Sequence, residues 1–331
     1  MLQIMPNALR LFAAAFLALC IAMVLDLHNP FWAAMPVWVV NQAFREDLLI
    51  RGILRLAGTI VGAAIGYLSL VYVADPMWQL VILALVVGLS TCVTYWIGTI
   101  YSYGPLITGI TAAVVMVPAF FSGSHMNMAD IAHFAVDRIW CTLIGVVSVT
   151  VVTYLFTPAR QDKRPARVEQ ERLKHAVFRG LGAGAATFAG TLPILLAPSV
   201  ITLSLALSLA IFSSILGSLQ DPRPVMRMMA VGVSLGVVAA LCYRGILHWL
   251  DPSLLPHMVI AGLFIFCGAV LRSFGTTAII GLDFNMCFLL AGEVGAEIHP
   301  LQSTAMGGIA MALAALAISQ AYRLMPRHHV G

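Results

Sequence analysis

Asp283 is the first residue of this chain whose type and position could do chemistry. It lies inside the apolar stretch 276–292, whereas most other charged residues lie near the ends of hydrophobic runs. If residues 272–293 formed one straight helix, Asp283 would lie about 16 Å from Arg272 and about 15 Å from Glu293, near the middle of a bilayer. Acids at that depth are costly and usually line a polar path or a proton relay. We therefore predict that Asp283 is a proton-coupling residue.

Asp283 also has a simpler structural interpretation, as a side chain that is hydrogen-bonded to hydroxyl groups or that caps a helix broken after Gly281. Asn285 would point about 200° away from Asp283 on a helix, so we expect it to contact a different neighbour. It is a further candidate to bind substrate. Glu293, Glu297 and His299 follow this stretch and could form an outer proton entrance, although an ordinary loop explains them more simply.

Two pairs of arginines are candidates to bind an anion. Arg51/Arg55 and Arg223/Arg227 have i, i+4 spacing and lead into glycine-bearing hydrophobic runs. A guanidinium group binds a carboxylate through two parallel hydrogen bonds. The alternative is that these arginines lie at helix ends, where they set the orientation of the chain. Arg138 starts a predicted helix on the side of the membrane opposite to these arginine pairs, where it is either paired structurally or lines an exit.

The elements that must position these residues are hydrophobic runs near spanning length. Hydrophobic residues make up 61% of the chain and charged residues 10%, which is more apolar than a soluble chain of this length could bury. The runs lie at 8–27, 30–42, 52–73, 77–97, 103–121, 138–156, 177–197, 200–218, 226–248, 255–271, 276–292 and 303–322. They predict an all-α polytopic membrane protein with about 12 transmembrane helices. The run 30–42 is short, which predicts a broken or tilted helix.

The distribution of basic residues predicts the orientation of these helices. The chain has 18 Lys and Arg, and all except Arg138 and Arg244 fall on one side if both termini are cytoplasmic. Such a bias is the usual mark of cytoplasmic loops. The net charge of +4 therefore reflects topology and does not indicate nucleic-acid binding.

The long polar segment divides the chain into two parts with six runs each. We predict a first membrane half at 1–157, a basic cytoplasmic linker at 158–176 and a second membrane half at 177–331. Because six is even, the halves would form a parallel repeat. When the two arginine pairs are aligned with each other, Asp283 aligns with the neutral Thr111. Glycines at every fourth position, Gly58, Gly62 and Gly66, predict close helix packing.

No segment resembles an active site or a metal site. The chain lacks His-Glu-x-x-His and Gly-x-Ser-x-Gly, so we do not expect an enzyme. The six cysteines are dispersed without a Cys-x-x-Cys pair, which favours packing over disulfides or metal ligation. We therefore expect neither a metal nor a cofactor.

Three segments together are similar to a known family. They read Asn-Pro-Phe-Trp-Ala-Ala at 29–34, Arg-Leu-Ala-Gly-Thr-Ile-Val-Gly at 55–62 and Arg-Ile-Trp-Cys-Thr-Leu-Ile-Gly at 138–145. Their order and spacing resemble the fusaric acid resistance and aromatic acid exporter family of bacterial inner-membrane proteins. The resemblance covers roughly residues 1–158. Many relatives carry large cytoplasmic domains that are not found between these runs, so the chain resembles a compact member.

The resemblance implies a proton-coupled exporter of aromatic carboxylic acids or related amphipathic compounds in the bacterial inner membrane. It also implies a periplasmic membrane-fusion protein and an outer-membrane channel as partners, besides the lipid bilayer and the substrate, and it leaves room for a homo-oligomer. Two aromatic clusters could contact such a substrate, unless they only anchor the helices at the interface: Phe31, Trp32 and Trp38, or Tyr95, Trp96, Tyr101 and Tyr103.

Two other functions remain open from the sequence. A non-transporting membrane scaffold or assembly subunit would need no proton-exchanging acid, so a neutral replacement of Asp283 would leave it functional. A major-facilitator-like transporter of another substrate would also have six plus six helices. It should carry a Gly-x-x-x-Asp-Arg type of loop, and residues 41–51 lack that pattern.

Overall fold

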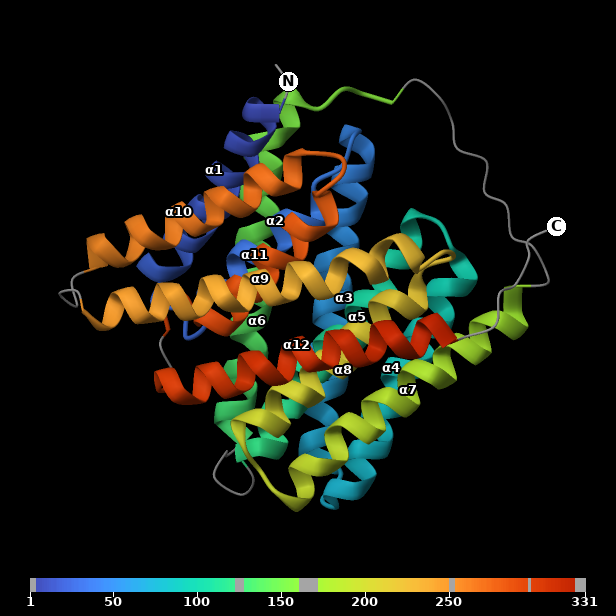
Figure 1. Cartoon of the computed structure of the whole chain (residues 1–331). Helices are drawn as coiled ribbons and strands as arrows, with labels where there is room; N and C mark the ends of the chain where they lie inside the picture. Colours follow the sequence, from blue (N-terminus) through green and yellow to red (C-terminus); the bar gives the residue numbers. More distant parts are fainter. Residues whose placement is uncertain (1–3, 123–127, 161–171, 250–253, 297–298, 325–331) are drawn as a thin grey trace.

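A computed structural model describes residues 4–122, 128–160, 172–249, 254–296 and 299–324 (Figure 1). These residues form twelve α-helices and two short 3-10 helices, and no strand occurs among them. The first six helices are α1 (Ile4–Val24), α2 (Phe31–Val40), α3 (Arg45–Tyr72), α4 (Pro76–Ile97), α5 (Tyr103–Ser122) and α6 (Met128–Thr153). The other six are α7 (Arg172–Leu196), α8 (Val200–Ser218), α9 (Arg223–His248), α10 (Leu254–Ser273), α11 (Ala278–Gly292) and α12 (Leu301–Leu324). The all-α prediction is therefore confirmed.

The helices have the lengths and composition of a polytopic membrane protein. Nine of the described helices are long and apolar enough to cross a bilayer, and α2 and α11 are shorter apolar helices. α2 has 10 residues and α11 has 15, against 28 in α3. At about 1.5 Å per residue, α2 spans only about half of a bilayer. The sequence predicted a broken or tilted helix at 30–42, and the structure has a short helix there.

Local sequence explains why α2 is short. Pro30 precedes it, Pro36 lies within it, and the backbone becomes extended at Asn41. Nine of its ten residues are buried, so the helix is packed on all sides. On one side it meets Gly145 of α6, where an added Cβ would clash with the Ala33 carbonyl and come within 2.8 Å of Pro36. α2 is therefore an internal helix rather than a lipid-facing one.

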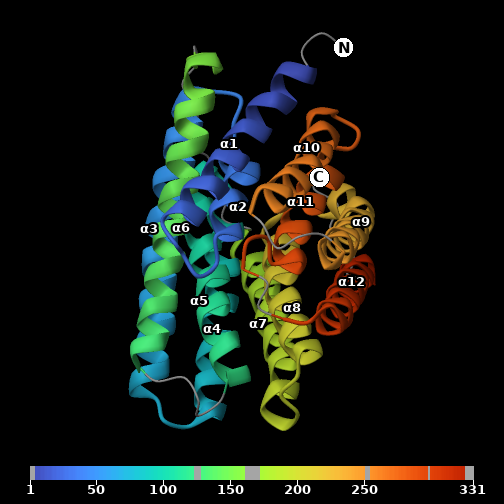
Figure 2. The ribbon, with the colours of Figure 1, turned by 90° about the vertical axis from the view of Figure 1, so that its left-hand side faces the viewer.

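The helix pairings recur along the chain. Several pairs of contacting helices have an equivalent pair six helices later in the chain. These equivalent pairs include α1–α2 and α7–α8, α3–α5 and α9–α11, α3–α6 and α9–α12, α2–α6 and α8–α12, and α4–α5 and α10–α11. The contacts between the two groups also recur, since α4 packs on α7 as α10 packs on α1. Figure 1 shows α3 and α6 side by side and steeply crossed by α9 and α12, which Figure 2 views nearly end-on.

Glycines bring α3 and α5 into backbone contact, as the sequence predicted. A Cβ on Gly58 would lie 2.5 Å from the Gly104 carbonyl, and one on Gly66 would lie 3.0 Å from Val115. Between them, Gly62 lies against the Thr108 carbonyl and Thr111. Small residues at such positions let two helices approach closely.

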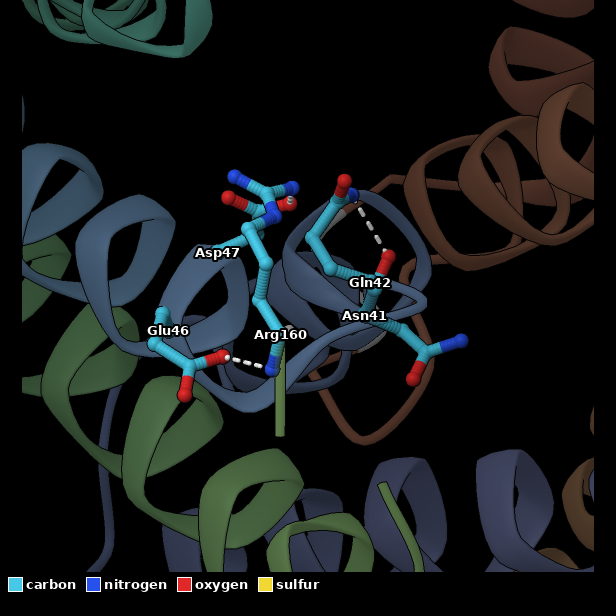
Figure 3. Close-up of polar contacts among 5 residues, drawn as sticks. All are labelled: Asn41, Gln42, Glu46, Asp47 and Arg160. Carbon is cyan, nitrogen blue, oxygen red and sulfur yellow. Dashed lines mark hydrogen bonds and ion pairs between the residues drawn. The ribbon is translucent and has the colours of Figure 1, made fainter. Parts of the chain in front are cut away.

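The start of α3 is clamped to the segment that follows α6. The Arg45 amide donates to the Pro158 carbonyl at 3.1 Å. Arg160 lies between two acids of α3: its amide donates to Glu46 at 2.9 Å and its guanidinium pairs with Asp47 (Figure 3). Residues 161–171 of the predicted linker lie outside the described residues.

Candidate functional site

Two buried arginines, Arg55 and Arg138, define the candidate site. The sequence placed Arg138 at the start of a helix and left a helix-end position open for Arg55, but neither arginine lies at a helix end. α3 begins at Arg45 and α6 at Met128, so each arginine lies well inside its helix, about 15 Å from the helix start. Arg55 is 4% exposed and Arg138 is 2% exposed. The first turns of both helices are polar and lie outside the hydrophobic runs 52–73 and 138–156, because helices can extend beyond the apolar core of a span.

Arg55 and Arg138 lie on the packed helices α3 and α6, and the charge of one acts on the other across the interior of the bundle. The guanidinium of Arg55 donates to the Tyr103 hydroxyl at 2.8 Å. That of Arg138 lies over the Trp32 ring, 3.9 Å from its centroid. We call these four side chains, from α2, α3, α5 and α6, the arginine site. Tyr103 and Trp32 are themselves buried.

The arginine site has unused hydrogen-bond donors. Among the described residues, Nε of Arg55 and both Nε and Nη1 of Arg138 are buried without a hydrogen-bond partner. Neither arginine forms an ion pair with a described carboxylate. Asp137 is the neighbouring acid, but its carboxylate accepts from the His28 amide at 3.1 Å. Buried charges without partners are costly, so the geometry favours an anion between these arginines.

Two threonines lie beside the arginine site, and the sequence analysis did not identify them. Thr59 and Thr142 are fully buried, and neither hydroxyl has a partner among the described residues. Some buried threonines, such as Thr91, donate to the carbonyl four residues earlier, whereas Thr111 and Thr191 also lack a partner among the described residues. Thr59 and Thr142 therefore leave their hydroxyl groups available in the interior.

A shared sequence pattern explains where the two threonines lie. Each is the fourth residue after a site arginine, so Arg-x-x-x-Thr occurs once on α3 and once on α6. The helices are antiparallel, since the start of α3 meets the end of α6. Gly52 of α3 faces Val146 of α6. Counting along the two antiparallel helices from this contact places Arg55 at about the same height in the bundle as Thr142, and Thr59 at about the same height as Arg138. Comparing the two motifs could have revealed this arrangement from the sequence.

Arg51 joins the arginine site to the carbonyl end of α2. Its Nη1 donates to the Val39 carbonyl at 2.9 Å, and its guanidinium lies 4.9 Å from the centre of the Tyr103 ring. Tyr103 therefore contacts both Arg51 and Arg55. The structure brings together Arg51, Arg55 and Arg138, which are three of the predicted substrate-binding residues.

The other predicted arginine pair lies elsewhere. Arg223 and Arg227 are exposed in the first turns of α9. The helix-end interpretation that the sequence left open describes them well, because an exposed arginine there stays in water.

Asp283 is buried, as predicted, but its surroundings differ from the prediction. Residues 274–277 turn between α10 and α11, so 272–293 is not one straight helix. A Cβ on Gly281 would clash with the Arg272 backbone, and the charges of Arg272 and Asp283 act on each other. Asp283 therefore lies near the start of a short helix and near Arg272, whereas a single straight helix would have kept them far apart. Its Oδ2 is buried without a partner among the described residues.

Asn285 points away from Asp283, as expected from their spacing. The Asp283 side chain faces Gly232 of α9, whereas the Asn285 amide presses against Gly268 of α10. Asn285 is fully buried, and neither atom of its amide has a hydrogen-bond partner among the described residues. It does not belong to the arginine site.

At the other end of α11, Glu293 and His299 form a separate pair. The His299 amide donates to Glu293 at 2.8 Å, and the imidazole Nδ1 pairs with the same carboxylate. This hydrogen bond raises the pKa of His299 above its usual value. Glu293 takes a left-handed backbone conformation with φ of 47°. Glu297, the third residue of the predicted proton entrance, lies outside the described residues.

A cavity of about 410 Å³ lies near the carbonyl end of α2. It is lined mainly by polar residues of α1, of the α2–α3 turn, of the segment after α6 and of the end of α10. The polar residues include Arg10, Asn41, Gln42 and Arg272, and Phe156 adds an aromatic ring. We call this cavity the basic vestibule. Arg272 in its lining also acts through its charge on Asp283, which is not part of the lining.

Together, these features define a class of protein. A helical bundle with many candidate spans encloses a cationic, aromatic-lined site, and a polar cavity opens at one end of the short helix beside it. Among the described residues, no cluster of His, Cys, Asp or Glu could hold a metal ion. The chain is a multi-pass membrane protein with buried, unpaired arginine donors among its described residues.

Sequence comparison then identifies the family. The fusaric acid resistance protein family matches residues 7–175, which include every residue of the arginine site, and the chain belongs to this family. No solved structure matches the chain.

The relatives are distant and longer than this chain. It is 25% identical over 189 residues to the p-hydroxybenzoic acid efflux pump subunit AaeB of Pantoea ananatis, a match covering 54% of this chain and 28% of the relative. It is 26% identical over 168 residues to AaeB of Musicola paradisiaca, covering 47% of this chain and 25% of the relative. An uncharacterized transporter of Gluconobacter oxydans is 32% identical over 157 residues, covering 45% of this chain and 20% of the relative. The chain thus matches about a quarter of the length of these relatives.

Proposed function

We propose that this protein exports small aromatic carboxylates across the bacterial inner membrane. One observation carries the proposal: Arg55 and Arg138 are buried near each other with unused donors and no paired carboxylate among the described residues. A carboxylate placed between them would receive charge-assisted hydrogen bonds in a region of low dielectric. The faces of Trp32 and Tyr103 would contact the ring of the substrate. The printed names of the AaeB relatives, which specify p-hydroxybenzoic acid, support the same class of substrate.

The hydroxyl groups of Thr59 and Thr142 extend this proposal to the polar substituents of the ring. Both are buried beside the arginines and lack partners among the described residues. A hydroxyl or amino substituent would satisfy them, whereas an unsubstituted ring would not. Sites that offer unpaired polar groups discriminate against ligands that leave those groups unsatisfied.

Asp283 is the proposed proton carrier. It is a buried acid with one unpartnered oxygen among the described residues, and its charge acts on Arg272, which in turn acts on Arg51 beside the arginine site. A proton on Asp283 would remove its negative charge and change the electrostatic field at the site. Coupling between proton and substrate would then pass through these charges.

We further propose that the chain consists of two six-helix halves of the same orientation, joined by the basic linker 158–176, with both termini in the cytoplasm. The recurring helix pairings support this division. The word "subunit" in the names of the AaeB relatives supports the proposal that a partner completes the exporter. A periplasmic membrane-fusion protein and an outer-membrane channel would be such partners.

Transport by the purified protein tests the proposed function. Proteoliposomes with an imposed pH gradient should move radiolabelled benzoate, and p-hydroxybenzoate should compete better than benzoate itself. Benzylamine, which has a similar ring and the opposite charge, should not compete. Arg55→Gln should abolish transport, whereas Arg227→Gln, at an exposed arginine of α9, should not. Equal competition by benzylamine and benzoate would refute the anion site.

A further inference from the structure

The basic vestibule is not part of the arginine site, and its lining has a chemistry of its own. Arg10 and Arg272 contribute two positive charges, while Asn41 and Gln42 contribute amides. Its lining contains no carboxylate among the described residues. A polar cavity with two cations and neutral hydrogen-bond donors is suited to a small anion.

The acids nearest to the vestibule do not cancel its charge. Glu46 and Asp47 are both engaged by Arg160 (Figure 3). In the same view, the Asn41 amide points away from this cluster. The negative charge of Asp283, on α11, acts on Arg272. The positive charge of Arg51 also acts on Arg272, in the opposite sense. Arg10 therefore supplies charge that no described carboxylate neutralises within ion-pair distance.

The vestibule also offers an aromatic surface. The Arg10 guanidinium lies over the Phe156 ring, 4.2 Å from its centroid, and Phe156 is 60% exposed. Leu11 lies in the lining beside them. A ligand with a carboxylate and one aromatic ring would find a cation and an apolar face here at the same time. The cavity of about 410 Å³ is large enough for one such ring and several waters.

A chain of contacts links the vestibule to the arginine site. Asn41 forms part of its lining and ends α2, and two residues earlier the Val39 carbonyl accepts from Arg51. Arg51 contacts Tyr103, which accepts from Arg55 of the arginine site. The carbonyl end of α2 and the Arg51 side chain are therefore the groups between the two places.

We propose that the basic vestibule is a separate binding site for small aromatic carboxylates, loaded before the arginine site. This inference rests on the proposed function for its substrate class. It adds a second site and assigns Arg10 as its specific ligand. A positively charged cleft raises the local concentration of anions. A peripheral site of this kind therefore helps an exporter to bind anions that are dilute.

Arg10 is the residue to change in a test. Its recorded contact is with Phe156, which also lines the vestibule, so a substitution there leaves the arginine site and Asp283 untouched. Arg272 is less suitable, because it also acts on Asp283. Arg227, exposed in the first turns of α9, is the matched control.

Benzoate efflux kinetics in proteoliposomes provide the first readout. Arg10→Gln should raise the KM about five-fold and leave the maximal rate within about two-fold, because the buried site is intact. Added salt should raise the KM of the wild type, and Arg10→Gln should lose most of that sensitivity. Arg10→Lys should restore it, and Arg227→Gln should behave as wild type. An unchanged KM with unchanged salt dependence in Arg10→Gln would overturn the inference.

Equilibrium binding of benzoate to the purified protein in nanodiscs separates this inference from the proposed function. The double variant Arg55→Gln/Arg138→Gln should still bind benzoate weakly, and adding Arg10→Gln should abolish that binding. This result would support the vestibule even if the wild type transported no benzoate, in which case only the proposed function would fail. If the double variant bound no benzoate, the vestibule would not be a separate site.

Discussion

The helix pairs α3–α5 and α9–α11 have the same packing and different chemistry. Gly62 of α3 lies against Thr108 and Thr111 of α5, and Gly232 of α9 lies against Ile280 and Asp283 of α11. One turn later, Gly66 meets Val115 and Gly236 meets Cys287. In one constant register, Thr108 corresponds to Ile280, Thr111 to Asp283 and Val115 to Cys287. One backbone arrangement thus holds a neutral threonine in one place and an acid in the other.

The positive charges show the opposite asymmetry. The glycine contacts align α3 with α9, because Gly62 corresponds to Gly232 and Gly66 to Gly236. In that register Arg55 corresponds to Val225, so the predicted match of Arg51/Arg55 with Arg223/Arg227 is wrong by two positions. The buried cations therefore belong to the first group of helices and the buried acid near Arg272 to the second. If the arginines bind the anion and Asp283 carries the proton, as proposed, each function can be changed by mutation without removing the other.

The largest expected effect comes from the cationic side of this comparison. Arg138→Gln should weaken benzoate binding at the arginine site by about 100-fold, because a buried charge-assisted contact is worth about 2–5 kcal/mol. The same change should raise the melting temperature of the ligand-free protein, because it removes a buried charge that lacks a paired acid among the described residues. Titration calorimetry and thermal unfolding in nanodiscs measure the two effects.

Opposite signs for binding and stability distinguish a ligand site from a structural one. Replacing an arginine that has only a structural role would lower the stability of the protein. Arg244, on α9, is the matched control, because its guanidinium donates to the His299 carbonyl. Arg244→Gln should lower the melting temperature and leave benzoate binding unchanged.

The corresponding positions Thr111 and Asp283 should differ next most strongly. Asp283→Asn keeps the size of the side chain and should make benzoate transport independent of the pH gradient. Where one proton limits transport, the wild-type rate should change about tenfold per pH unit. Thr111→Val should leave the pH dependence of the rate unchanged, because a threonine side chain has no carboxyl group to titrate. Efflux assays at several imposed gradients compare the two variants, and equal behaviour would refute the proposed asymmetry.

The shared packing should show equal sensitivity in both helix pairs. Gly62→Ala and Gly232→Ala should each destabilise the protein by about 1–3 kcal/mol, because the added methyl group meets backbone atoms of the facing helix. Gly245 on α9 has no atom within 4 Å of an added Cβ, so Gly245→Ala is the matched control. Chemical denaturation in mild detergent measures these differences. A large effect at only one of the two glycines would contradict the common packing.

The smallest expected effect concerns Glu293 and His299 at the far end of α11. Because Glu293 raises the pKa of His299, this pair stabilises the fold fully below the ordinary histidine pKa of about 6.5. The stabilisation is lost as the pH rises through the raised pKa of the folded state. The melting-temperature difference between wild type and Glu293→Gln should therefore be greater at pH 5.5 than at pH 9. A difference that does not vary with pH would show that only the bond to the His299 amide matters.

The sequence predicted the helices well because spanning length and apolar composition are local properties. It predicted the close approach at Gly58, Gly62 and Gly66 for the same reason. It misplaced Arg55 and Arg138, since nothing local distinguishes a helix that starts at its apolar core from one that starts two or three turns earlier. It also missed the turn at 274–277, which brings Arg272 beside Asp283 although the spacing suggested a long separation. Contacts among α2, α3, α5 and α6 depend on tertiary packing, which no single segment encodes.

The short helix α2 has a consequence for how the chain enters the membrane during synthesis. Its 10 residues are too few to cross a bilayer alone, and α6 carries Arg138 in its interior. An arginine at the centre of a helix costs about 2.5–3.5 kcal/mol on insertion. α2 covers Arg138 with the ring of Trp32, and Gly145 of α6 gives α2 a place to dock. Stable insertion of α6 should therefore wait for α2, so that biogenesis of the first six helices proceeds as one cooperative unit and not as independent hairpins.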